Sequence, residues 1–348
     1  MSEIKMANAS NNSTEQCNPP YSESEQAVIA MYSIILVIGL PANILTAVLT
    51  LIQIRRKNVL AVYLFSLSIS ELMYLGTLPL WILYVKNGHN WIWGPMACKI
   101  TGYIFFNNIY ISIFLLCCIS IDRFIAVEFS LESRGIRRQR VAILVTCILC
   151  VLVGLTHSPT FIFNDGEKDG DPCFEKLPMD PLIARFYFAR FVIGFLIPLL
   201  ILIFTNYTIK RRIETSSSFT DHQKTKVKWL ARTIIIIFMI CFAPYHLVLL
   251  LRAIMFSLDN ANSCSFEEAI YTTYSAFLCL VTMNSVADPF IYVLVSENVR
   301  KDIYKALRGW RSQVFVNIKS DNSTQHNIQN STEQQAEKQT STQLMDFP

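Results

Sequence analysis

The chain has 348 residues, of which 52% are apolar and 16% are charged, and its formal net charge is +4. Soluble domains contain about 45–50% apolar and about 25% charged residues. Segments 1–26 and 312–348 are rich in Ser, Asn, Gln and Glu, so the sequence between them is more apolar than the average indicates. This composition excludes a disordered protein, a coiled coil, a collagen and a small disulfide-rich protein, and it favours a chain that crosses a membrane several times.

Seven apolar segments are long enough to cross a membrane, because a transmembrane helix needs about 20 mostly apolar residues. They lie near 27–53, 59–85, 97–126, 141–163, 182–209, 230–257 and 268–295. Prolines inside them are compatible with helix, since packed neighbours can satisfy the backbone groups that proline leaves free. We therefore predict an all-α fold, a seven-transmembrane helix bundle over 27–295.

Lysine and arginine residues identify the cytoplasmic side, because short cytoplasmic connections carry an excess of them. They concentrate in 55–57, 134–140, 210–232 and 300–311, whereas the alternate connections hold few. We predict that these four segments are cytoplasmic, that the N-terminus is extracellular, and that the chain lies in the plasma membrane.

The two polar ends have different predicted roles. The extracellular tail, residues 1–26, carries candidate N-glycosylation sites at Asn8, Asn11 and Asn12. In 296–311, apolar residues at helical spacing alternate with basic residues, which predicts a short amphipathic helix on the inner leaflet. Residues 312–348 form a predicted disordered cytoplasmic tail, whose Ser and Thr residues are either phosphorylation substrates or part of a solvated tail without a role.

Ten cysteines occur without a CxxC pair or a Cys/His cluster, so we expect no metal centre built from them. The four that lie outside the apolar segments or at their outer ends are Cys17, Cys98, Cys173 and Cys264. In the predicted topology all four are extracellular, where disulfides persist. Their spacing does not select among the three possible pairings.

Polar side chains lie inside the predicted spans, where a charged group costs at least about 2.5–3.5 kcal/mol. Those at comparable depths are Glu71, Asn108, Ser112, Asn284 and Asp288. Carboxylate, amide and hydroxyl oxygens suit a structural Na⁺ ion or a shared proton better than zinc. Alternatively, these groups bond one another and fix the packing of the helices. We expect no other cofactor.

Six short motifs occur in order along the spans. They are Gly39-Leu40-Pro41-Ala42-Asn43, Leu67 to Leu72, Trp91 to Gly94 with Cys98, Asp122-Arg123-Phe124, Phe238 to Pro244, and Asp288-Pro289-Phe290-Ile291-Tyr292. With seven spans and an outer N-terminus, this pattern resembles the rhodopsin-like (class A) G-protein-coupled receptors over residues 27 to about 308. Glu71, Phe242 and Asp288 depart from it, since the family usually has Asp, Trp and Asn there.

The resemblance implies a signalling mechanism and its partners. A heterotrimeric G protein binds the cytoplasmic face, and Asp122 holds Arg123 until the sixth span swings outward. The implied hinges are Pro244 and Pro289, and the side chains that repack are Phe238, Phe242 and Tyr292. Arrestin and receptor kinases are the implied partners of the Ser/Thr-rich tail.

Further stretches narrow the resemblance to the proton-sensing and lysolipid receptor group. They are 58–64, 76–81 and 117–124. Within that group, 131–135 and 241–250 most resemble a lymphocyte-receptor branch that is associated with oxidised fatty acids, lysolipids and other lipid-like acids. The disulfides that this resemblance implies are Cys98–Cys173 and Cys17–Cys264.

Two arginines in the outer halves of the spans indicate an anionic ligand. Arg190 lies in the fifth span and Arg252 near the outer end of the sixth, and a buried guanidinium matches a carboxylate or phosphate bidentately. We predict a lipid-like acid whose chain lies in an aromatic cavity. The other predicted lining residues are Phe105, Phe106, Tyr110, Glu175, Tyr245, His246, Tyr271 and Tyr274. Alternatively, Arg190 pairs internally with an outer-loop acid such as Glu175.

Proton sensing is the main alternative function. His89, His157 and His246 can face the outer half, but 141–163 holds no Asp or Glu, which related proton sensors carry there. A weaker response through the two buried carboxyls remains open. A membrane transporter is a remote alternative, since we find no internal repeat. We find no catalytic constellation and therefore expect no enzyme, and we expect no nucleic-acid partner.

Overall fold

The computed structural model describes residue 17 and residues 19–129, 137–161, 172–174, 181–215, 220–258 and 263–295. All regular elements in these ranges are helical, which confirms the predicted all-α fold. Seven stretches among them are long and apolar enough to cross a membrane, as the sequence predicts. The predicted glycosylation sites, Glu175, the amphipathic helix of 296–311 and the tail of 312–348 lie outside the described residues.

The first four spans contain one long helix each. They are α1 (Tyr21–Arg55), α2 (Val59–Lys86), α3 (Gly94–Glu128) and α5 (Gln139–His157), the last continued by the 3₁₀ turn η1 (Ser158–Phe161). α1 begins before the predicted boundary at residue 27, so the end of the segment assigned to the extracellular tail is helical. Glu23 lies in its first turn, where a negative charge stabilises the positive end of the helix dipole.

The last three spans are interrupted. The fifth span consists of α6 (Pro181–Phe191), the π-helical turn η2 (Val192–Leu196) and α7 (Ile197–Thr215). The sixth span consists of α8 (Asp221–Ile237), the π-helical turn η3 (Phe238–Phe242) and α9 (Ala243–Leu258). The seventh span consists of α10 (Ser263–Thr282) and α11 (Asn284–Val295). Pro198 and Pro244 lie just after the two π-helical turns. Because proline removes a backbone donor and crowds the preceding turn, the widening of the helix at these points follows from the sequence.

α8 begins at Asp221, earlier than the predicted start of the sixth span at residue 230. Thr220 and Gln223 form a capping box: the Thr220 hydroxyl accepts from the Gln223 N–H at 3.3 Å, and the Gln223 side chain accepts from the Thr220 N–H at 3.2 Å. The added turns are polar, so an apolar-segment criterion does not detect them.

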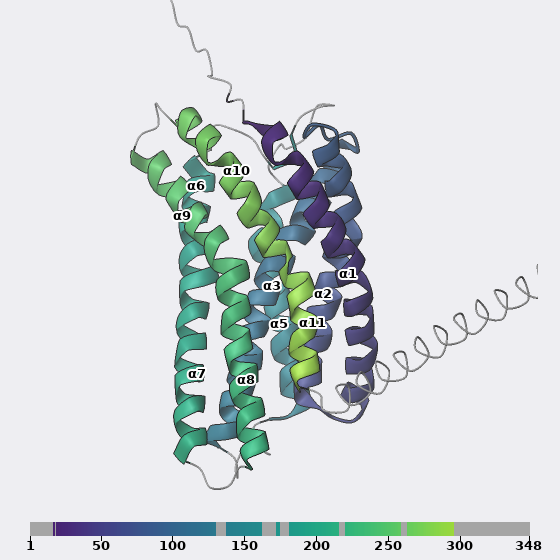
Figure 1. Cartoon of the computed structure of the whole chain (residues 1–348), viewed down its shortest axis with the longest axis vertical. Coiled ribbons are helices and arrows are strands. Elements are labelled where there is room, and N and C mark those ends of the chain that lie inside the picture. The colour runs from purple at the N-terminus through teal and green to yellow at the C-terminus, as the bar shows by residue number, and fades with distance from the viewer. Residues whose placement is uncertain are drawn as a thin grey trace, which may run out of the picture. The chain divides into compact units, whose positions relative to one another are not determined.

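α3 contacts α2, α5, α7 and α8, so it lies at the centre of the described bundle. Figure 1 shows α10 and α11 following each other in front of α3, and both pack against α1. α5 packs chiefly on α2 and α3. Large apolar side chains such as Ile148, Leu152 and Ile193 are exposed on the outside of the fourth and fifth spans, where a membrane protein meets lipid.

Candidate functional site

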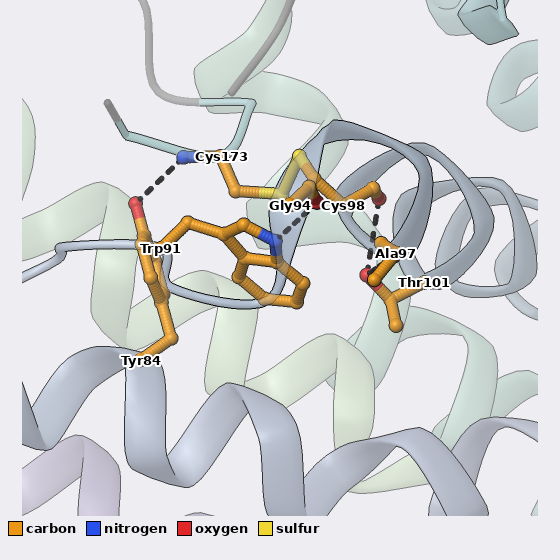
Figure 2. The surroundings of a disulfide bond; sticks show 7 residues. All are labelled: Tyr84, Trp91, Gly94, Ala97, Cys98, Thr101 and Cys173. Carbon is orange, nitrogen blue, oxygen red and sulfur yellow. Dashed lines mark hydrogen bonds between the residues drawn. A yellow bond between two sulfur atoms is a disulfide. The ribbon is translucent and has the colours of Figure 1, made fainter. Parts of the chain in front are cut away.

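Both disulfides that the resemblance implies are formed. Cys98 pairs with Cys173 and Cys17 pairs with Cys264. Figure 2 shows the first of them: the Cys173 N–H donates to the Tyr84 hydroxyl at 3.1 Å, and the Trp91 indole donates to the Gly94 carbonyl at 2.8 Å. The residues around Cys173 are thereby held against the outer ends of α2 and α3.

Phe174, next to this disulfide, closes the space above the outer part of α3. A Cβ atom at Gly102 would collide with the Phe174 ring, so the small residue permits this close approach. The ring also lies edge-on to Phe106, with 5.7 Å between the ring centroids. The disulfide and the glycine thus position an aromatic cover directly over the predicted ligand-binding residues.

Arg190 lies at the inner end of α6, beneath this cover. Its guanidinium carbon lies 4.3 Å from the centroid of the Phe106 ring and 6.0 Å from those of Tyr110 and Tyr187. The side chain makes no ion pair or hydrogen bond with the residues that the structure describes. Aromatic faces attract a cation but do not neutralise it. The positive charge therefore remains available to an anion.

Arg252 differs from Arg190, although the sequence predicts the same role for both. Its Nε donates to Glu267 at 2.7 Å, and the two side chains are only 9% and 5% exposed. The Tyr274 ring centroid lies 4.6 Å from its guanidinium carbon, and Tyr187 lies between the two arginines at 5.6 Å. Glu267 therefore neutralises Arg252, and the function of Arg252 as a second ligand anchor stays a prediction.

The other predicted lining residues divide into two groups. Tyr110, His246, Tyr245 and Tyr274 form a chain of ring contacts from α3 to α10, with centroids 5.2–6.3 Å apart. Phe105 instead packs on Tyr74 and Trp81 of α2, although it also touches Phe106. Tyr271 stacks edge-on with Tyr21 and His89 at the outer end of α1. Of the predicted lining residues, Phe106 and Tyr110 lie against the Arg190 guanidinium, and Tyr245, His246 and Tyr274 interact with it electrostatically.

Two buried polar atoms in the first group lack partners among the described residues. They are the Tyr110 hydroxyl and His246 Nε2. Tyr110 is 4% exposed and His246 is fully buried, while His246 Nδ1 is 2.8 Å from the Phe242 carbonyl. A buried polar group without a partner costs about 1–3 kcal/mol, so such atoms in a native structure indicate a bound group or water.

A second polar site lies deeper, between α2, α3 and α11. Glu71 accepts from the Ser112 hydroxyl at 2.7 Å and from the Asn284 amide at 3.0 Å, and the Ser285 hydroxyl also donates to it. The Asn108 amide donates to the Ser70 hydroxyl at 3.4 Å and also interacts with the Glu71 carboxyl. The predicted cluster is therefore assembled, with Ser285 as a member that the sequence does not single out.

Asp288 of this cluster is 2% exposed, and neither of its carboxyl oxygens has a hydrogen-bond partner among the described residues. It interacts electrostatically with the carboxyl of Glu71. The Asn284 amide oxygen also lacks a partner. These oxygens can hold a proton between two carboxyls or serve as ligands of a hard cation.

The C-terminal end of α3 carries a three-residue ion-pair cluster. Asp122 accepts from Arg123 Nε at 3.1 Å and bidentately from Arg137 at 2.8 and 2.9 Å. Arg137 is a partner of Asp122 that the motif alone does not predict.

Near the same end of the bundle, Gln53 donates to the Tyr292 hydroxyl at 2.9 Å, which joins α1 to α11.

The predicted repacking residues of the sixth span lie at its π-helical turn. Phe238 and Phe242 begin and end η3, with their ring centroids 5.8 Å apart. Phe238 also stacks on Phe195 of η2, 5.5 Å away. Pro244 follows in α9, and Pro289 lies inside α11. The two π-helical turns thus meet directly, beneath Arg190 and His246.

Comparison with known proteins decides the family. Residues 42–292 match the family model described as "7 transmembrane receptor (rhodopsin family)". The chain belongs to the rhodopsin family of seven-transmembrane receptors. It is therefore a multi-pass membrane protein and a G-protein-coupled receptor.

Individual relatives of the receptor cover most of its length. "Probable G-protein coupled receptor 132" is 49% identical in Homo sapiens, over 86% of this chain and 79% of the relative, and 48% identical in Mus musculus, over 90% and 83%. "G-protein coupled receptor 68" of Bos taurus is 33% identical over 86% and 82%. "Lysophosphatidic acid receptor 6" of Mus musculus is 30% identical over 90% and 94%.

Two residues of the receptor's outer site emerge only from the structure: Tyr187 separates the two arginines, and Glu267 pairs with Arg252. His157, which the sequence indicates only as a candidate for proton sensing, stacks on Tyr110 with 5.0 Å between the centroids. Tyr187 could have been found, because it lies three residues before Arg190 and so shares its helix face. No local pattern links Glu267 to Arg252, since the two residues lie in separate helices, α10 and α9.

Proposed function

We propose that this receptor is activated by a single-chain acidic lipid at the plasma membrane, with its N-terminus outside, and that it signals through a heterotrimeric G protein. The observation that carries the proposal is Arg190, a cation within the outer half of the bundle that has no carboxylate among the described residues. A charge inside a membrane span is costly unless it is paired. An acidic ligand supplies the missing partner.

The chemistry around Arg190 supports a lipid rather than a small polar acid. Phe106, Tyr110 and Tyr187 surround the guanidinium with aromatic rings, and a cavity of about 590 Å³ adjoins it. The name of one relative, "Lysophosphatidic acid receptor 6", states that it responds to a single-chain lipid with an anionic head. A phosphate or carboxylate head would bind Arg190 and an apolar chain would occupy the cavity.

A response to extracellular acid is the second candidate function. It is favoured by Asp288, whose carboxyl is buried beside that of Glu71 without a hydrogen-bond donor among the described residues. A proton shared by the pair, or a structural Na⁺ ion held by Asp288, Asn284 and their neighbours, would satisfy these oxygens. Exchange of one for the other would couple this site to pH.

A G-protein activation assay in cells separates the two candidates. Acidic lipids are applied at outside pH values from about 8 to 6, a window around the ordinary pKa of histidine. We expect activation by lipid at both ends of the window. Activation by acid without lipid would favour the second candidate, and a response to neither stimulus would contradict both.

On the cytoplasmic side, we propose that Asp122 holds Arg123 in the inactive state. The hinges Pro244 and Pro289 then allow the sixth span to open for the G protein. The proposed partners of the Ser/Thr-rich tail are arrestin and receptor kinases.

The contact between Arg137 and Asp122 predicts the direction in which basal signalling changes when Arg137 is replaced. In Arg137→Gln, Arg123 is the remaining described partner of Asp122, so the inactive pair tightens. We expect agonist-independent signalling to fall about two- to fivefold, which corresponds to a partly exposed ion pair. Basal G-protein activation is measured at equal surface expression, with the exposed neighbour Arg138→Gln as the control. A rise in basal signalling would show that Arg137 restrains the receptor instead.

A further inference from the structure

A groove runs along the outer half of the bundle between α5 and the fifth span. Its volume is about 590 Å³, within the range of about 300–1,000 Å³ that is typical of small-molecule sites. Tyr110 and Phe114 of α3 form its floor, and Leu152 of α5 and Ile193 of η2 form its walls. Of the described residues that line it, Arg190 alone is charged.

The groove exists because two neighbouring spans do not close on each other. α5 packs chiefly on α2 and α3, while the fifth span packs on α3 and on the sixth span. Leu152 is 58% exposed and Ile193 is 57% exposed. In a membrane these apolar side chains face lipid, so the groove opens sideways into the hydrocarbon region.

Three of the residues that line the groove, Arg190, Tyr110 and His157, bring polar groups close together. Arg190 lies over the Phe106 ring, with no anion among the described residues. The Tyr110 hydroxyl is buried beside it and has no hydrogen-bond partner in the described part of the chain. His157 stacks on the same tyrosine ring, 5.0 Å between centroids. A mostly apolar groove that contains a cation and a hydroxyl without partners among the described residues matches an amphiphile with an anionic head.

We propose that the activating lipid enters from the bilayer through this groove, places its head on Arg190 and Tyr110, and keeps its chain between Leu152 and Ile193. This inference rests on the proposed function and adds to it the route and the seat of the chain. The head is a carboxylate or a phosphate monoester, because both match a guanidinium and a hydroxyl donor.

The test blocks the groove without touching Arg190. Leu152→Trp narrows it, and Ile193→Trp does so from the opposite wall. Leu155→Trp is the matched control, because Leu155 is a 64% exposed residue of the same helix that does not line the groove. Receptors with equal surface expression are assayed for G-protein activation by octanoic, lauric and stearic acids and by the corresponding lysophosphatidic acids.

We expect each groove variant to lower the potency of the stearoyl compounds by about tenfold, which is the loss of roughly two buried methylene groups, and to spare octanoic acid. Activation by the fatty acids identifies the head group as a carboxylate, and activation by the lysophosphatidic acids identifies it as a phosphate. A groove-variant potency equal to that of Leu155→Trp, or a loss independent of chain length, would overturn the inference. Arg190→Gln is run alongside: a loss that is the same for all chain lengths supports the anchoring role separately, and no loss would overturn the proposed function itself.

Discussion

Arg190→Gln is expected to lower the potency of an acidic lipid by about thirtyfold or more. Removal of one partner of a buried, hydrogen-bonded charge pair costs about 2–5 kcal/mol, and each 1.4 kcal/mol is tenfold in affinity. The substitution removes the charge and shortens the side chain, but it keeps a group that can form hydrogen bonds. Concentration–response curves for G-protein activation measure the shift.

The matched control for this prediction is Arg185→Gln on the same helix. Arg185 is exposed and does not line the groove, so its loss should leave lipid potency unchanged. Surface expression is compared by labelling an extracellular tag. If Arg190→Gln and Arg185→Gln have equal potencies, Arg190 does not bind the lipid head.

Glu267→Gln is expected to have the largest effect on stability. It leaves the Arg252 guanidinium, whose side chain is 9% exposed, without its carboxylate. Breaking a buried ion pair on one side costs about 3–5 kcal/mol, because the remaining charge stays buried without compensation. We expect a sharp fall in surface expression and a lower melting temperature of the detergent-solubilised receptor.

The double variant Arg252→Met/Glu267→Met separates charge burial from packing. Replacement of a buried pair by apolar side chains is often neutral or stabilising, so expression should recover. Glu214→Gln is the surface control: its pair with Lys228 is half exposed and should contribute at most about 1 kcal/mol. If the double variant is no better folded than Glu267→Gln, the buried charge is not the cause of the loss.

Much of the fold could be predicted because the insertion of a segment into a membrane depends on the composition of that segment and of its immediate flanks. Apolar length defines the spans, and the distribution of lysine and arginine predicts their direction. The start of α8 could not be found this way, since its first turns are polar and depend on the capping box of Thr220 and Gln223. The disulfide pairing required the family resemblance, because four cysteines allow three pairings.

The candidate site was predictable only as far as single residues reveal it. Arg190 and Asp288 stand out because charges are rare in membrane spans. Their partners do not, since contacts between distant segments leave no periodic signal. The sequence therefore predicts the same role for Arg252 and Arg190, and only the structure shows that Glu267 neutralises one of these two arginines. Likewise, no local pattern predicts the contact between Arg137, just before α5, and Asp122 of α3.

The most direct test of the central claim crosses a change in the receptor with a change in the ligand. An activating free acid and its methyl ester are compared on the unmodified receptor and on Arg190→Gln. If Arg190 binds the ionised head, the unmodified receptor prefers the acid strongly, while the variant responds to acid and ester with similar, low potency. An unchanged preference for the acid in Arg190→Gln would contradict the account.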